Sequence, residues 1–217
     1  EGLGALLAEG SRAAAAQVGQ GSIAFAPQVK GLELPGYEPR TLQAMALGLA
    51  VNARGADHNR SGAYEADLSG RFDRMAGGDA HVAAAIETED RAAVMDSMIL
   101  CKFLRGVFEE PYPEWARLLS AVSGWDVDGD ELEATARRVV LAKRAFNARE
   151  GWTRADDTLP DRFLSESLPL GSGREAALTS ERLESMIRAY YAARGLTDDG
   201  LPNADQLADL QLEALVH

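Results

Sequence analysis

The sequence contains a single cysteine, Cys101, among 217 residues. One thiol excludes an internal disulfide, and it excludes a cysteine-rich metal site held by this chain alone. Because intracellular proteins are usually kept free of disulfides, we expect a cytoplasmic location.

Long apolar runs are missing as well. The uncharged apolar stretches are much shorter than the ~20 residues that cross a bilayer. No basic segment precedes a signal-like apolar core. We therefore expect no contact with a membrane.

Positive charge is scarce. Lys and Arg number 22 against 34 Asp and Glu, which gives a net charge of −12, and the acidic residues are dispersed along the chain. An acidic protein repels the phosphate backbone, so we expect no nucleic-acid partner.

Several familiar catalytic motifs are also absent. There is no glycine-rich phosphate loop, no nucleophile elbow and no C-x-x-C pair, and the three histidines lack metal-ligand spacing. The acidic run DVDGDE at 126–131 is similar to a calcium loop, but its glycine is at the fourth position rather than the sixth. We interpret this run as the cap of the helix that follows.

The chain does contain enough apolar residues, 46%, for an ordinary core. Apolar spacing and end signals predict a mostly α, multihelical, bundle-like fold with at most a few short strands near residues 22–35. The predicted helices span residues 3–18, 40–54, 88–108, 113–123, 128–150 and 180–194. We expect two closely packed helical domains, residues 1–110 and 111–217.

The stretch MDSMILCKF at 95–103 places a carboxylate and the single thiol in apolar sequence. Taken alone, Cys101 fits a buried packing residue. Asp96 needs hydrogen-bond donors in such surroundings, either from a neighbouring loop or from a ligand. On a regular helix the two side chains point about 140° apart, which favours two adjacent ligands over one shared atom.

His58 follows a predicted helix and lies between Arg54 and Arg60, within an irregular stretch from 57 to 78. Long irregular loops are often functional. An imidazole there is either an ordinary surface residue or a proton-transfer group, and the sequence leaves both interpretations open.

Four longer segments stand out together. They are VKGLELPGYEPRTLQAMALGLAVNARGADH at 29–58, MDSMILCKF at 95–103, RAFNAREGWTRADDTLPDRFLSESLP at 144–169 and YYAARGLTDDGLP at 190–202. In order and spacing they resemble the C-terminal part of the aldehyde ferredoxin oxidoreductase family, the tungstopterin enzymes. The resemblance covers nearly the whole chain, so it is more specific than any short motif.

The resemblance implies roles for three residues. Asp96 and Cys101 match the family pattern D-x-x-G-L-C, whose aspartate binds the amine end of a pterin and whose cysteine is the fourth ligand of a [4Fe-4S] cluster. His58 matches the histidine that the family places near tungsten, where it exchanges a proton. Ile99 stands where the pattern has glycine, and its β-branched side chain would crowd a pterin.

The family's other three cluster cysteines, spaced C-x-x-C-x-x-x-C, belong to an upstream part that also contains a mainly β pterin-binding domain. The resemblance therefore implies a partner, the missing N-terminal pterin-binding domain or subunit. We expect tungstopterin or molybdopterin and [4Fe-4S] in that complete enzyme and no cofactor in this chain alone, since one cysteine cannot hold a cluster.

The predicted function follows from that resemblance. The complete enzyme would oxidise a small aldehyde to a carboxylic acid and pass electrons through the cluster to a ferredoxin-like acceptor, and the isolated chain would be inactive. The alternative is a cofactor-free helical module that serves protein interaction or assembly.

Overall fold

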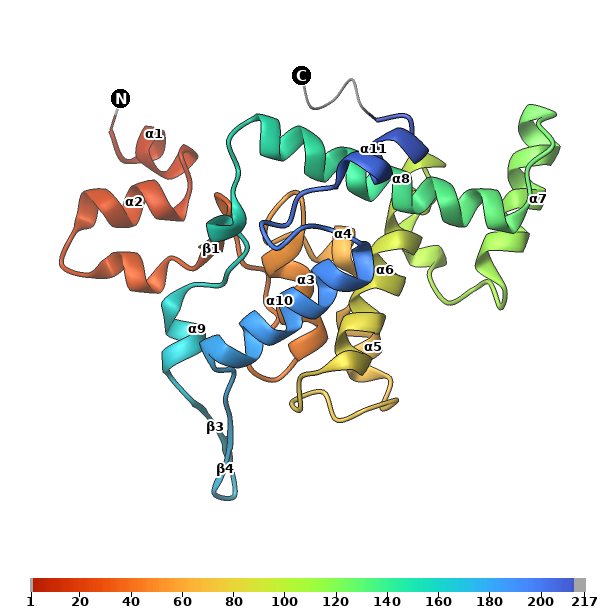
Figure 1. The fold of residues 1–217 in the computed structure, drawn as a ribbon. Helices are drawn as coiled ribbons and strands as arrows, with labels where there is room; N and C mark the ends of the chain where they lie inside the picture. Colours follow the sequence, from red (N-terminus) through yellow and green to blue (C-terminus); the bar gives the residue numbers. More distant parts are fainter. Residues whose placement is uncertain (1, 213–217) are drawn as a thin grey trace.

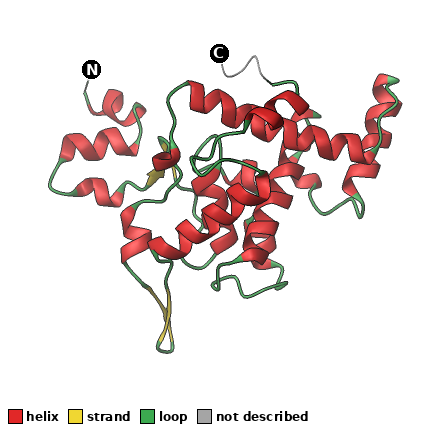
Figure 2. Ribbon diagram, viewed as in Figure 1, coloured by secondary structure: helices red, strands yellow, loops and turns green. Residues whose placement is uncertain are grey.

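The computed structural model describes residues 2–212, and within that range helices dominate and the strands form two small antiparallel hairpins (Figures 1 and 2). The predicted mostly α fold class is confirmed. The helices are α1 (Leu3–Ala8), α2 (Ser11–Val18), α3 (Gln43–Val51), α4 (His58–Ser61), α5 (Tyr64–Leu68), α6 (Asp79–Ser97), α7 (Pro111–Ser123), α8 (Gly129–Arg149), α9 (Asp161–Ser165), α10 (Ser180–Arg194) and α11 (Ala204–Asp209). The strands are β1 (Gln28–Val29), β2 (Leu32–Glu33), β3 (Leu168–Gly171) and β4 (Arg174–Ala176).

Helices with clear end signals form as predicted. Helix α10 has both predicted ends, capped by the Thr179 hydroxyl, and α7 ends at Ser123 before a left-handed glycine. The acidic run before α8 is a cap, because the Asp128 carboxylate accepts a hydrogen bond from Glu131 N at 2.9 Å. The first hairpin falls inside the predicted strand region.

Four predictions were wrong in detail. The single helix predicted at 3–18 is broken by Gly10 at φ 89°, and the irregular stretch after 57 contains α4 and α5. The helix predicted at 88–108 is α6, which begins nine residues earlier and ends at Ser97. Thr88, the first residue of the predicted helix, lies inside α6, where its hydroxyl donates to Ala84 O. The second hairpin, β3–β4, projects from the molecule and was not predicted (Figure 1).

Helix α3 lies at the centre of the molecule, and all nine of its residues are buried. Its sequence QAMALGLAV is apolar on every side, which is typical of a helix without a solvent face. Neither end of such a helix can reach water, so other groups must satisfy its terminal N–H and C=O groups. At the N-terminus, the buried Asp67 carboxylate accepts hydrogen bonds from Ala44 N at 3.2 Å and Met45 N at 2.9 Å.

Three side chains satisfy the carbonyls at and beyond the C-terminus of α3. Lys30 donates to Ala50 O, Arg144 to Val51 O at 3.4 Å, and Asn147 to Ala53 O at 2.6 Å. An anion at the N-terminus and cations at the C-terminus also match the helix dipole. The capped helix then fixes the start of the loop that leads to His58.

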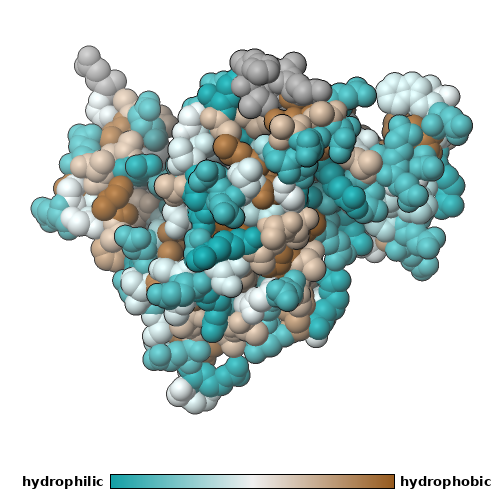
Figure 3. Space-filling model, in the orientation of Figure 1, coloured by the Kyte–Doolittle hydropathy of each residue, from teal (hydrophilic) through white to brown (hydrophobic). Residues whose placement is uncertain are grey.

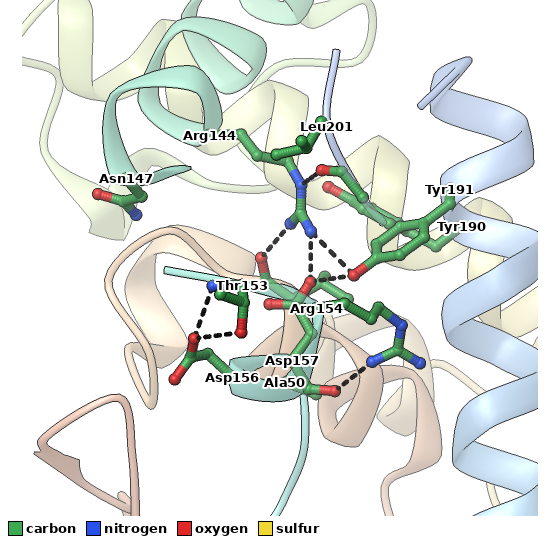
Figure 4. Close-up of polar contacts among 12 residues, drawn as sticks. Ala50, Arg144, Asn147, Thr153, Arg154, Asp156, Asp157, Tyr190, Tyr191 and Leu201 are labelled. Carbon is green, nitrogen blue, oxygen red and sulfur yellow. Dashed lines mark hydrogen bonds and ion pairs between the residues drawn. The ribbon is translucent and has the colours of Figure 1, made fainter. Parts of the chain in front are cut away.

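The two cations share one buried counter-ion, Asp157. Figure 4 shows the contacts of its carboxylate with Arg144 and Tyr191. Lys30 Nζ lies 2.7 Å from Asp157 Oδ1, while Arg144 and the Tyr191 hydroxyl both donate to Oδ2. Burial by itself would raise the pKa of Asp157, but Lys30, Arg144 and these hydrogen bonds together lower it below its ordinary value of 3.8. The network joins the first hairpin, α8 and α10 around the end of α3.

The main hydrophobic core surrounds α3 and combines residues up to Ala85 with Leu159, Leu178 and residues of α10 such as Met186 and Tyr190. A second cluster joins the end of α6 to α7 and α8 through Met95, Trp115 and Leu132. The predicted division at residue 110 stays a prediction. The face drawn in Figure 3 is mostly hydrophilic, with small scattered apolar groups. Among the described helices, none has the length and apolar character that crossing a membrane requires.

We expect Asp157→Asn to lower the free energy of unfolding by roughly 3–5 kcal/mol at neutral pH, because it leaves Lys30 and Arg144 buried without a counter-ion. A lowered pKa means that this contribution is present above the unfolded-state value, about 3.9, and is lost as pH falls through the folded-state value. The loss caused by the substitution should therefore shrink in acid. Urea unfolding at several pH values measures it, with the exposed Asp126→Asn as a control expected to change little. A loss that grew in acid would contradict this assignment.

Candidate functional site

The sequence-predicted site begins where α6 ends. Leu100 N donates to Met95 O at 2.8 Å and Ile99 N to Asp96 O at 3.2 Å, which is the Schellman arrangement of a helix C-terminus. This motif needs a left-handed residue, and Ile99 fills that place at φ 58°. A β-branched residue is strained in this conformation. The chain turns there and leaves the helix axis.

This turn corrects one assumption of the sequence analysis. Asp96 and Cys101 do not share a regular helix, because Asp96 lies in the last turn of α6 and Cys101 follows the Schellman turn. The angle expected from helical spacing therefore does not apply.

Asp96 is held between two cations. Lys102 Nζ lies 2.8 Å from its Oδ1, and the Arg60 guanidinium of α4 pairs with its Oδ2. These are the hydrogen-bond donors that a carboxylate in apolar sequence requires. The side chain keeps 21% of its surface exposed, so the carboxylate is fixed and still accessible.

Cys101 is exposed, so its interpretation as a buried packing residue was wrong. It precedes a single 3-10 turn, Lys102–Leu104, and large apolar side chains surround it in sequence. Ile99 is 91% exposed, Phe103 94% and Val107 63%. A monomeric protein seldom exposes so many apolar residues in one short segment without a partner.

His58 is the first residue of α4, a helix whose N-cap is Asp57. Asp57 also pairs with Arg54 at 2.9 Å, so both arginines that flank His58 in the sequence are bound to carboxylates. The imidazole lies against two tyrosines, with ring centroids 5.4 Å from Tyr37 and 6.2 Å from Tyr64. These aromatic contacts place the ring against the loop that carries Tyr37 and against α5.

Two bridges connect these pieces. First, Arg60 joins the helix of His58 to Asp96. Second, Tyr64 contacts His58 and also accepts a hydrogen bond from Arg105, in the segment after Cys101, at 2.8 Å. Burial raises the pKa of Tyr64 to about 12, so the phenol stays protonated at neutral pH. The structure thus brings the segments of His58, Asp96 and Cys101 into one neighbourhood.

A cavity of about 450 Å³ opens beside Asp96. It is lined by residues of the loop after α3, of α4, of α6 and of α8: Asn52, Ala53, Arg54, Arg60, Glu89, Ala93, Asp96, Val140, Ala142, Lys143, Phe146 and Asn147. Its size is that of an ordinary small-molecule site. The exposed surface of its lining is mainly apolar, and the charged and amide side chains contribute only a small part of it. Across residues 2–212, no three His, Cys, Asp or Glu side chains gather as a metal site would require.

Comparison with known proteins supports the same family. The family model described as "Aldehyde ferredoxin oxidoreductase, domains 2 & 3" matches residues 1–212. This chain belongs to the aldehyde ferredoxin oxidoreductase family.

Individual relatives agree with that membership. The chain is 35% identical over 215 residues to the tungsten-containing aldehyde ferredoxin oxidoreductase of Pyrococcus furiosus, covering 97% of this chain and 34% of that protein. It is 35% identical over 203 residues to the enzyme of the same name from Thermococcus kodakarensis, covering 91% and 32%. It is also 27% identical over 221 residues to the P. furiosus "Aliphatic sulfonate oxidoreductase, WOR-like subunit", covering 97% and 32%. The chain thus spans about a third of the length of these relatives.

A solved structure shares the fold. The complex titled "Active site complex BamBC of Benzoyl Coenzyme A reductase in complex with 1,5 Dienoyl-CoA" matches with a TM-score of 0.66 at 19% identity, over 98% of this chain and 37% of that one. At this identity the match describes the fold alone.

Sequence reasoning missed several residues of the site. Arg60 was noticed only as a neighbour of His58, and Lys102 and Tyr64 were not singled out at all. Arg60 and Tyr64 act through residues that are distant in the sequence. Arg60 contacts Asp96, 36 residues away, and Tyr64 contacts Arg105, 41 residues away. The one available signal was the adjacency of Lys102 to Cys101.

The Schellman turn explains the glycine of the aldehyde ferredoxin oxidoreductase pattern D-x-x-G-L-C at the position of Ile99. Since glycine adopts the left-handed conformation without strain, we expect Ile99→Gly to stabilise the chain by about 1 kcal/mol, which raises Tm by about 2–4 °C. Little packing is lost, because the side chain is 91% exposed. Calorimetry of the Gly, Asn and Ala variants should rank them in that order, since Asn tolerates this conformation better than Ala. A lower Tm for Ile99→Gly would show that the side chain contributes packing.

Proposed function

We propose that this chain supplies the Asp96, Cys101 and His58 side chains of a tungsten (or molybdenum) pterin enzyme that oxidises aldehydes to carboxylic acids. One observation carries the proposal: a fixed carboxylate and an exposed thiol lie on either side of a single helix-ending turn. Two different cofactors could therefore be contacted from one place. The tungsten and aldehyde in the names of the relatives support this assignment.

Asp96 fits the role of a pterin ligand. An ionised carboxylate offers about four lone-pair positions for hydrogen bonds. Arg60 and Lys102 use one position on each oxygen. Acceptor positions remain for the N–H groups of a pterin amine.

Cys101 fits one ligand position of a [4Fe-4S] cluster and no more, since such a cluster is held by four ligands. The other three thiolates would have to come from the pterin-binding domain or subunit. The exposed Ile99, Phe103 and Val107 fit this arrangement, because a docked domain would cover them together with Cys101.

The overall reaction is an aldehyde plus water giving a carboxylic acid, two protons and two electrons. When bound, the pterin metal supplies the two-electron oxidation, and the cluster passes the electrons to a ferredoxin-like acceptor. His58 would accept, on a ring nitrogen, the proton that water releases as it adds to the aldehyde carbonyl. Its contacts with Tyr37 and Tyr64 hold the ring in place for that transfer.

For the assembled enzyme, purified without oxygen, we expect His58→Asn to lower the turnover of aldehyde by about 10²–10⁴-fold while metal content stays the same. The buried His81 is the matched control, since its Nε2 contacts Asp73 O at 3.0 Å. His81→Asn should reduce stability and leave turnover per bound metal unchanged. Full activity in His58→Asn would refute the catalytic role, and loss of metal would show a structural one.

We expect Cys101→Ala to lower the iron content of the assembly and to abolish electron transfer to ferredoxin. Val122→Ala, a change at an exposed position outside this segment, should leave both intact. Iron analysis and the spectrum of the reduced cluster measure the effect. A fully iron-loaded Cys101→Ala enzyme would rule out the ligand role, and an assembly that contains no metal in the unsubstituted form would favour the cofactor-free assembly module.

An aliphatic sulfonate tested beside the aldehydes separates the two substrate classes named among the relatives.

A further inference from the structure

A second, smaller cavity lies beneath the segment that follows Cys101. Its volume is about 80 Å³, and it is enclosed by α6, by the start of α7, by the turn between α4 and α5, and by residues 104–108. It shares no lining residue with the larger cavity beside Asp96. The two cavities are therefore separate candidates for ligands.

Three residues that line this small cavity each carry a buried hydrogen-bond donor. Arg91 Nε, Arg105 Nη1 and Trp115 Nε1 each expose less than 1 Å² and have no acceptor among residues 2–212. They are three of the six such side-chain atoms in that range. A buried donor without an acceptor is costly, so three of them around one cavity indicate a missing acceptor.

Close packing fixes the Trp115 side chain. The rings of Phe108 and Tyr112 contact Trp115 edge-on, with centroids 5.9 Å and 5.8 Å away, and the indole is 2% exposed. Arg91 is held by Glu87, 3.0 Å from its Nη2. The Arg91 side chain as a whole is 43% exposed, and only its Nε is buried without an acceptor among residues 2–212.

Arg105 is fixed even more firmly. Its Nε lies 3.0 Å from a Glu65 carboxylate oxygen and donates to Lys102 O at 3.0 Å, while Nη2 donates to the Tyr64 hydroxyl. Only Nη1 lacks a partner in the described chain. This nitrogen belongs to the same short segment as Cys101.

We propose that this cavity binds a short-chain carboxylate such as formate, acetate or propionate. Two carboxylate oxygens can accept three N–H groups, two of which belong to guanidinium groups. The Glu65 carboxylate also lines the cavity and is paired with Arg105, so the donors recognise the ligand by hydrogen bonds more than by net charge. The apolar walls of Met95, Leu104 and Phe108 suit a short alkyl group better than they suit phosphate, which presents oxygen on every side. The volume is about half that of a cavity that holds benzene, so an aromatic acid does not fit.

A bound carboxylate would join Arg105 to α6 and α7 and so hold the segment that carries Cys101. This proposal does not depend on any redox role, because none of its donors is a proposed cofactor ligand.

The test is a titration of the full chain with sodium acetate, followed by the indole N–H signals of its three tryptophans in a proton–nitrogen NMR spectrum. We expect the signal of Trp115 to shift and saturate, and sodium chloride at equal ionic strength to leave it unchanged. Trp115→Phe keeps an aromatic ring but removes one donor, so it should weaken acetate binding by roughly tenfold. Trp125→Phe, at a 65% exposed position, is the matched control and should bind acetate normally.

Two results would overturn the proposal. If formate, acetate and propionate all leave the Trp115 signal of the unsubstituted chain unchanged, the donors are satisfied by water or by a protein group. If inorganic phosphate shifts it and the carboxylates do not, the ligand class is wrong. Both results come from the unsubstituted protein, so they do not depend on whether a variant folds.

Discussion

The structure depends on the capping of one buried helix. Helix α3 has no solvent face, so every terminal backbone group needs a partner from the protein. Asp67 supplies an anion at one end, and Lys30, Arg144 and Asn147 supply donors at the other. Those donors come from segments that lie far apart in the sequence, so satisfying this one helix fixes how the first hairpin and α8 are placed.

Helix α3 fixes the position of the proposed site. The loop after α3 leads directly to Asp57 and His58, and Gly55 within it passes so close to Val29 that a Cβ would lie 2.2 Å from the Val29 carbonyl oxygen. Arg60 then extends from α4 to the end of α6. The carboxylate of Asp96 is thus oriented by a chain of contacts that begins in the core, while the residue itself stays accessible.

The segment after α6 is strained and exposed, unlike the buried and capped helix α3. It carries a strained Ile99, exposed apolar side chains and, beneath it, three donors without acceptors in the described chain. Local stability is lowest where backbone strain and unpaired groups accumulate. This is the part of the molecule whose structure would change most when a partner domain or a small ligand binds.

The sequence by itself determined the helical class, the C-terminal end of α7, both ends of α10, and the family. Those features follow from local apolar spacing, from caps and glycines, and from long ordered segments that are read along the chain. It also singled out His58, Asp96 and Cys101, but it placed the last two on one helix, because nothing local marks Ile99 as a left-handed residue. Only the tertiary structure decided that Arg60 and Lys102 hold Asp96, that Asp157 neutralises two buried cations, and that three donors meet at one cavity. Each of these depends on residues brought together by packing, and the pairing of side chains far apart in sequence leaves no periodic signal in the sequence.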